Sequence, residues 1–358
     1  MKKTIRLSFL LFLSVLIGCT NDSNEPDAPA SGTFDVTFED GLQNTVYPSV
    51  IFGLAEVEKQ TNQAIDFFDV HFTADNATNI RVTVQESALN YETVVTQQVS
   101  QGSNTFSPKL KWKYDALRYM AQPGYTDVTF VCEDSSGKEI GRKNMKVSYR
   151  AINECVLAAR LNNQTYPLFF LLGSYVNEDS PVIDAFLKDV LDMTSLNAFT
   201  GYQLGTEESV WQQVAAMFYT LRAKGVKYSS ITDTSSGNPN VVSQYIRFAD
   251  EMVANTQANC ADGTVFLCGA LRKIGLHPVM VFQPGHVYLG YYTDETKRNF
   301  YLLETTMIGG SASFEDATMA NVQHFNSKIN EYNNGDYFDM YFTIAIDAIR
   351  PIVKPIGR

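Results

Sequence analysis

Apolar and polar residues alternate in short segments along the first 150 positions of the chain. Four segments are of this kind: residues 34–38, 80–84, 91–99 and 126–131. A period of two predicts β-strands that bury one face. Ser136-Gly137 lies between the last segment and a similar one at 145–147, and predicts a turn. We therefore expect residues 33–150 to form an antiparallel β-sandwich, immunoglobulin-like in organisation.

Near residue 150 the period of the apolar positions changes to that of a helix. Residues 181–193 have a possible Ser180 cap, a proline in the first turn and one apolar face, which predicts an amphipathic helix. Two more helices are expected at 207–222 and 244–255, and a fourth begins at Cys260. Short apolar runs then return at residues 278–282, 287–292, 300–303 and 337–346. This order predicts an α+β domain over residues 151–358.

The segment Ala258-Asn259-Cys260-Ala261-Asp262-Gly263-Thr264 places a cysteine where the fourth helix begins. Leu267 and Leu271 recur at helical spacing, and Gly275 ends the run. A thiol at a helix N-terminus lies among unpaired backbone N–H groups at the positive end of the helix dipole. Both features favour the thiolate, which is the reactive form. The alternative is that Cys260 is a buried structural thiol.

A histidine and a carboxylate follow Cys260 at the edges of two predicted strands. His286 comes 26 residues after Cys260, directly behind a Pro-Gly turn, and Glu304 comes 18 residues later at the end of an apolar run. A carboxylate in that place must be paired or exposed. Cysteine, histidine and acid in this order suggest a nucleophile, a base and a group that orients the base.

These motifs carry a resemblance to a known family. Asn259-Cys260-Ala261-Asp262 and the following residues 271–279 are similar to the cysteine helix and next strand of the transglutaminase-like branch of the papain-like thiol enzymes. The resemblance covers about residues 211–306. It implies a helix on an antiparallel sheet, with Cys260 as nucleophile, His286 as base and Glu304, where the family usually has aspartate, as orienting acid.

Acyl transfer also requires donors for the oxyanion. The backbone N–H of Cys260 is available by its position. A side-chain donor is expected from upstream, with Gln244 and Trp211 as candidates. The alternatives are a helix-surface role for Gln244 and a core position for Trp211.

The remaining histidines and cysteines are expected to be structural. His71, His277 and His324 read as strand, loop and solvent-facing residues, and Cys268 lies mid-helix among apolar neighbours. Cys132 and Cys155 flank the expected domain boundary and either pair in a disulfide or stay as two buried thiols.

No cofactor and no metal site is expected from the sequence. A zinc site made of Cys260, His286 and Glu304 has too few ligands and too little sulfur for a structural site. No phosphate-binding loop and no glycine-rich nucleotide motif is present in the sequence.

The first 32 residues resemble a bacterial lipoprotein signal and its tether. Lys2, Lys3 and Arg6 precede an apolar core at 7–17, which ends in Leu16-Ile17-Gly18-Cys19. This lipobox-like ending implies lipidation of Cys19, with residues 20–31 as a flexible tether. The alternative is ordinary secretion with a chance cysteine. We expect an exported protein anchored at the cell envelope, on the periplasmic or surface face of the outer membrane.

Composition narrows the class of partner. The chain has 358 residues, 45% of them hydrophobic, and a net charge of −11. Such an acidic chain lacks the basic footprint that nucleic acid requires, so a peptide or protein substrate is expected. Exported bacterial members of the family more often look hydrolytic, which favours a cysteine peptidase or amidase over a crosslinking enzyme. The alternative is a surface binding or scaffold lipoprotein that has lost turnover.

Overall fold

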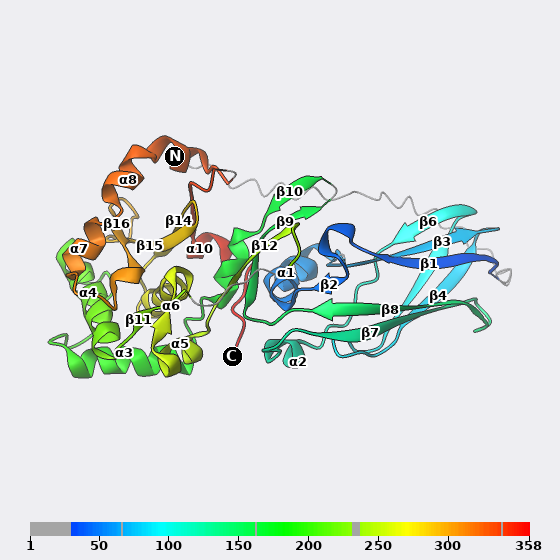
Figure 1. The fold of residues 1–358 in the computed structure, drawn as a ribbon, viewed down its shortest axis with the longest axis horizontal. Helices are drawn as coiled ribbons and strands as arrows, with labels where there is room; N and C mark the ends of the chain where they lie inside the picture. The colour runs from blue at the N-terminus through cyan, green and yellow to red at the C-terminus, as the bar shows by residue number, and fades with distance from the viewer. Residues whose placement is uncertain (1–29, 66, 162, 231–236, 338) are drawn as a thin grey trace.

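The computed structural model describes residues 30–358 except residues 66, 162, 231–236 and 338 (Figure 1). The predicted signal sequence, the lipobox with Cys19 and most of the tether lie outside the described residues. The described chain is an α+β protein that combines helices with mainly antiparallel sheets. None of its described helices is both long enough and apolar enough to span a bilayer.

Two sheets form one end of the molecule. The first has the order β1-β3-β6 and the second the order β2-β8-β7-β4-β5. The strands are β1 (Gly32–Phe38), β2 (Thr45–Val46), β3 (Phe68–Ala74), β4 (Thr78–Val84), β5 (Thr93–Val99), β6 (Gly102–Phe106), β7 (Gly124–Glu133) and β8 (Glu139–Tyr149). All pairs are antiparallel except β2 with β8. The rings of Phe68 and Phe130 meet between the sheets at 5.2 Å. The predicted strands and the turn at 136–137 are confirmed.

A long helix interrupts these strands and corrects the expectation of an all-β segment. Helix α1 (Pro48–Thr61) begins with a proline in its first turn and ends at Asn62 in the left-handed conformation. It packs against the 3₁₀ segment η2 (Phe169–Tyr175) and β9 (Glu154–Leu161). A Cβ at Gly53 would lie 2.3 Å from Leu171 Cδ2, so a larger residue there would require the Leu171 side chain to move. A single hydrophobic core therefore continues across residue 150.

A three-stranded antiparallel sheet occupies the middle of the molecule (Figure 1). Its order is β10-β9-β12, with β10 at Gln164–Pro167 and β12 at Val241–Tyr245. The predicted helix over 244–255 is wrong in its first part, because Gln244 pairs with Cys155 on β9. Only α5 (Ala249–Asn255) is helical. Pairing with a distant strand outweighs the weak local helical pattern.

Helices and a four-stranded antiparallel sheet of order β16-β15-β14-β17 form the other end. The sheet contains β14 (Pro278–Gln283), β15 (His286–Tyr292), β16 (Phe300–Leu303) and β17 (Phe342–Ala345). The main helices are α3 (Pro181–Met193), capped by Ser180 as predicted, α4 (Glu207–Ala223) and α6 (Cys260–Lys273), which lies against β14 and β15. The predicted strand at 337–346 is shortened to β17 by the turns before it and by α10 (Ile346–Ile349) after it.

Short elements complete the fold. They are η1 (Asp40–Leu42), α2 (Tyr114–Arg118), β11 (Lys227–Tyr228), β13 (Gln257–Ala258), η3 (Thr305–Met307), α7 (Phe314–Met319), α8 (Val322–Ser327) and α9 (Ile329–Asn334). The cysteines Cys132, Cys155 and Cys268 are buried and free. Of the two possibilities left open for Cys132 and Cys155, the structure therefore has two separate buried thiols.

Candidate active site

The residues around Cys260 form a reciprocal cap that fixes where α6 begins. Asn259 has an extended backbone, and its side-chain oxygen accepts the N–H of Asp262 at 2.8 Å. In return, Asp262 Oδ2 accepts the N–H of Asn259 at 2.9 Å. The two bonds satisfy two of the helix's orphan donors. Cys260 is thereby held as the first helical residue, with its side chain half-buried at the helix end.

Arg247 stabilises this cap through its contacts with Asp262. Its guanidinium lies 2.7 Å from Asp262 Oδ2, and its backbone N–H donates to Oδ1 at 2.8 Å. The side chain of Asp262 is fully buried and that of Arg247 is 8% exposed. Burial raises the pKa of Asp262, while the hydrogen bonds from Asn259 and Arg247 act in the opposite direction. The helix start is thus tied to the chain that leads into α5.

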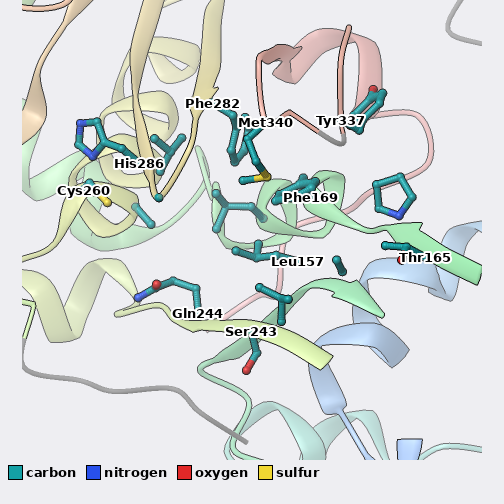
Figure 2. A pocket seen from close by; sticks show the side chains of 17 residues that line it. Leu157, Thr165, Phe169, Ser243, Gln244, Cys260, Phe282, His286, Tyr337 and Met340 are labelled. Atoms are coloured by element: carbon teal, nitrogen blue, oxygen red, sulfur yellow. The ribbon is translucent and has the colours of Figure 1, made fainter. Parts of the chain in front are cut away.

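His286 stands between Cys260 and an acid. It opens β15 directly after Gly285, whose φ of 70° makes the turn. Its Nε2 lies 2.7 Å from Glu304 Oε2. Cys260 also acts on this ring and raises its pKa, and the two side chains line one cavity. Because Nε2 is engaged by Glu304, the ring nitrogen that remains for the thiol is Nδ1, and Figure 2 shows one ring nitrogen turned toward Cys260.

The surroundings of the imidazole stabilise its charged form. Burial lowers the pKa of His286, but its interactions with Cys260 and Glu304 outweigh burial. The pKa of His286 is raised to about 10. The ring therefore holds two protons at neutral pH when it faces these partners.

Glu304 is held as an ionised carboxylate by four donors. It follows β16 and is 7% exposed. Its Oε1 accepts the N–H and the hydroxyl of Thr306 at 3.0 and 2.6 Å, and its Oε2 accepts Asn321 Nδ2 at 2.7 Å beside the bond to His286. Burial opposes ionisation, but the hydrogen bonds from His286, Thr306 and Asn321 prevail and lower the pKa of Glu304.

Two of these partners were not anticipated from the sequence. The contact with Thr306 could have been predicted from the sequence, since an acid two residues before a hydroxyl residue is typical of a local side-chain cap. The contact with Asn321 could not, because Asn321 lies 17 residues beyond Glu304 in the sequence and reaches it only through the return of the chain after α7.

A close contact ties the first turn of α6 to the segment after Glu304. A Cβ at Gly263 would lie 3.0 Å from Thr305 Cβ. The Thr305 hydroxyl donates to the carbonyl of Cys260 at 3.3 Å, and the Thr264 hydroxyl donates to the same carbonyl at 2.7 Å. The nucleophile's backbone and the acid's backbone are thus held in one rigid unit.

A cavity of about 400 Å³ opens beside Cys260 (Figure 2). Cys260, His286 and Gln244 all line it. The Gln244 side chain extends from β12 toward the Cys260 end of the cavity (Figure 2), and its amide donates to the carbonyl of Tyr245 at 3.2 Å. The structure therefore places Gln244 in the same cavity as Cys260 and His286, although from a strand rather than from a helix.

Trp211, the other oxyanion candidate, lies elsewhere. It is on α4, and its ring centroid is 5.0 Å from that of Phe314 on α7. It does not line the cavity among the residues described. This position matches the alternative of a core-packing aromatic, because helical spacing turns it toward α7 instead of toward Cys260.

The other histidines and Cys268 are accounted for by local contacts. His71 on β3 bonds the hydroxyls of Thr37 and Thr105, and His277 Nδ1 lies 2.6 Å from Asp347 Oδ2. His324 is exposed on α8, as predicted, and Cys268 is fully buried. Across the described part of the chain, no group of three or more His, Cys, Asp or Glu side chains is arranged to hold a metal ion.

Comparisons with known proteins add little to this geometry. No family model matches this chain, and a search of the curated proteins finds no match. Among solved structures, the transglutaminase of red sea bream is similar with a TM-score of 0.24 and 11% identity. The alignment covers 79% of this chain and 54% of that one, so the chain spans about half the length of that structure. The functional assignment therefore rests on the site itself.

Proposed function

We propose that this chain is a thiol acyl-transfer enzyme that hydrolyses peptide or other amide bonds. The observation that carries the proposal is the position of His286, which lines the same cavity as Cys260 and lies 2.7 Å from the buried carboxylate of Glu304. Nucleophile, base and orienting acid in mutual contact are what this chemistry needs.

In the proposed reaction, Cys260 and His286 form a thiolate–imidazolium pair. The sulfur attacks the amide carbonyl carbon, the C–N bond breaks, and the imidazolium gives its proton to the leaving nitrogen. Water then attacks the thioester, its proton passes to His286, and the thiolate leaves. Glu304 stabilises the charged ring and holds its orientation throughout.

Two donors are available for the oxyanion in this mechanism. The N–H of Cys260 lies at the helix start, where it has no partner within α6. The side-chain amide of Gln244 has two N–H groups, of which one donates to Tyr245. The second N–H is the side-chain donor that we assign to the oxyanion.

The finer identity of the fold and the location of the protein belong to the same proposal. The order of cysteine helix, histidine strand and acid strand supports a papain-like, transglutaminase-like domain at 151–358. The two-sheet region at 33–150 is proposed to be immunoglobulin-like. The Lys-rich start and the lipobox-like residues 16–19 support export, lipidation of Cys19 and anchoring at the bacterial envelope.

Iodoacetamide labelling at pH 6 tests the activated thiol. We expect rapid alkylation of the peptide that contains Cys260, because an ordinary thiol with a pKa of about 8.5 is almost wholly protonated at that pH. Cys260→Ser should lose this label, as read by mass spectrometry. Cys268→Ala is the matched control, since that thiol is buried, and should keep it. Labelling of Cys260 at the rate of free cysteine would favour the alternative of a binding or scaffold protein.

The pH dependence of alkylation tests the role of His286. Since its pKa is raised to about 10, the ring keeps its charge as pH rises from 6 and loses it only near pH 10. We expect the rate constant for iodoacetamide to be nearly flat between pH 6 and about 9. In His286→Gln it should instead fall about tenfold per unit below about 8.5, as an ordinary thiol does. Identical profiles for the two proteins would contradict the ion pair.

A further inference from the structure

Part of the cavity beside Cys260 is built by residues outside the region at 211–306 that resembles thiol enzymes. One wall comes from the central sheet, with Leu157 on β9 and Val242 on β12. Another comes from Phe169 on η2 and Met340 in the turn before β17. Phe169 is fixed by ring contacts with Phe282 and Phe342, at 5.5 and 4.8 Å. The cavity is thus a formed feature with rigid aromatic support.

The residues that line the cavity disfavour the binding of a charged group. Apart from the groups at the Cys260 end, the lining is mainly apolar, and among the described residues no Asp, Glu, Lys or Arg lines it. Three hydroxyl residues also line it, Thr165, Ser243 and Tyr337, and the Ser243 hydroxyl donates to Glu154 Oε1 at 2.8 Å. An ionised side chain placed here would lose its hydration without gaining a partner.

The direction of the cavity relates it to one side of the reacting bond. Cys260 and His286 lie at one end, and the apolar walls extend away from them past Met340 and Phe169 (Figure 2). In the proposed mechanism His286 gives its proton to the departing nitrogen, so the amine departs beside His286, whose side chain is 22% exposed. The acyl part stays bonded to sulfur and points along the cavity.

We infer, on the basis of the proposed function, that the cavity receives a bulky, uncharged apolar side chain on the acyl side of the amide that is cleaved. The substrate class is therefore a peptide with a residue such as leucine or phenylalanine at that position. A volume of about 400 Å³ lies in the usual range for a ligand pocket and exceeds what a small side chain fills.

Inactivation by N-acetyl-aminoacyl chloromethyl ketones tests the side-chain preference. In these probes the thiolate displaces chloride and forms a thioether, and the varied residue occupies the acyl side. We expect the second-order rate constants for the leucine and phenylalanine probes to exceed those for alanine, lysine and aspartate by at least about tenfold. Iodoacetamide, which has no side chain, measures the thiol separately on the same protein.

A pair of substitutions ties the preference to the wall. Val242→Asp adds a carboxylate to the cavity at a residue that is 59% exposed, so the fold tolerates it. We expect the ratio of the leucine rate to the lysine rate to fall at least about tenfold. Val94→Asp is the matched control, because Val94 is 41% exposed on β5, the edge strand of the five-stranded sheet. It should leave the ratio unchanged.

The outcomes separate the two proposals. Equal rates for all five ketones, together with iodoacetamide labelling at pH 6, would overturn the assignment of the cavity and leave the activated thiol standing. No labelling by iodoacetamide would overturn the proposed function. In that case the cavity is tested by measuring how N-acetyl-leucine amide and N-acetyl-lysine amide bind to Cys260→Ser. Equal binding of the two amides, or no binding, overturns the inference. Binding of the leucine amide that is at least tenfold tighter supports it.

Discussion

Replacing Glu304 by glutamine is expected to lower kcat/KM for an amide substrate by about 10⁴-fold, the size of effect seen when the acid of a catalytic triad becomes an amide. The carboxylate accepts hydrogen bonds from the N–H and hydroxyl of Thr306 and from Asn321 Nδ2, and it pairs with His286 Nε2. A glutamine must turn its NH₂ toward one side of this set. If the NH₂ faces Thr306, it opposes the N–H and hydroxyl donors of that residue. If it faces Asn321 and His286, it opposes the Asn321 amide and donates to the ring, which then holds the imidazole in the wrong tautomer.

Glu207→Gln is the matched control for that substitution. Glu207 is an exposed glutamate that accepts hydrogen bonds from Tyr301 and Asn299 and lies outside the cavity lining. Its loss should leave kcat/KM unchanged. Thermal unfolding of both variants reports whether the fold is intact. A folded Glu304→Gln protein with kcat/KM within about threefold of the wild type would exclude the orienting role of the acid.

Replacing Asp262 by alanine is expected to lower the free energy of unfolding by about 3–5 kcal/mol, because it leaves the Arg247 guanidinium buried without its charge partner. The substitution also removes the acceptor for the backbone N–H groups of Asn259 and Arg247. Urea unfolding measures the change. The activity of the folded fraction should fall as well, since Asp262 holds the first turn of α6 in place.

Asp192→Ala is the control for the loss of an ion pair as such. Asp192 pairs with Lys188 on α3, and both side chains are more than half exposed. Its loss should change the free energy of unfolding by no more than about 1 kcal/mol. If Asp262→Ala were as mild as Asp192→Ala, the buried pair would not be what fixes the start of α6.

Local signals in the sequence were sufficient to single out Cys260, His286 and Glu304 as candidates. The helical spacing of Leu267 and Leu271 and the stop at Gly275 predict a helix that begins at Cys260, and the structure has that helix. The turn before His286 and the end of an apolar strand at Glu304 are equally local. Such signals act over a few residues, so they survive without knowledge of the rest of the fold.

Contacts over long distances in the sequence were not predictable in this way. Gln244 was predicted to be helical because no residue near it in the sequence indicates that it pairs with Cys155 on β9. Helix α1 was missed among strands, although Pro48 at its start and Asn62 at its end are ordinary helix signals. The partner Asn321 and the cavity walls depend on which distant segments meet, and that is decided by tertiary packing.

Helix α1 has a consequence for how this chain is made. The segment that it packs against, η2, begins 108 residues after Thr61. The residues of α1 are therefore synthesised several seconds or more before those of η2, at about 5–20 residues per second. Because η2 packs against α1 and also provides Phe169 to the cavity, one short segment couples the stability of the N-terminal helix to the shape of the site.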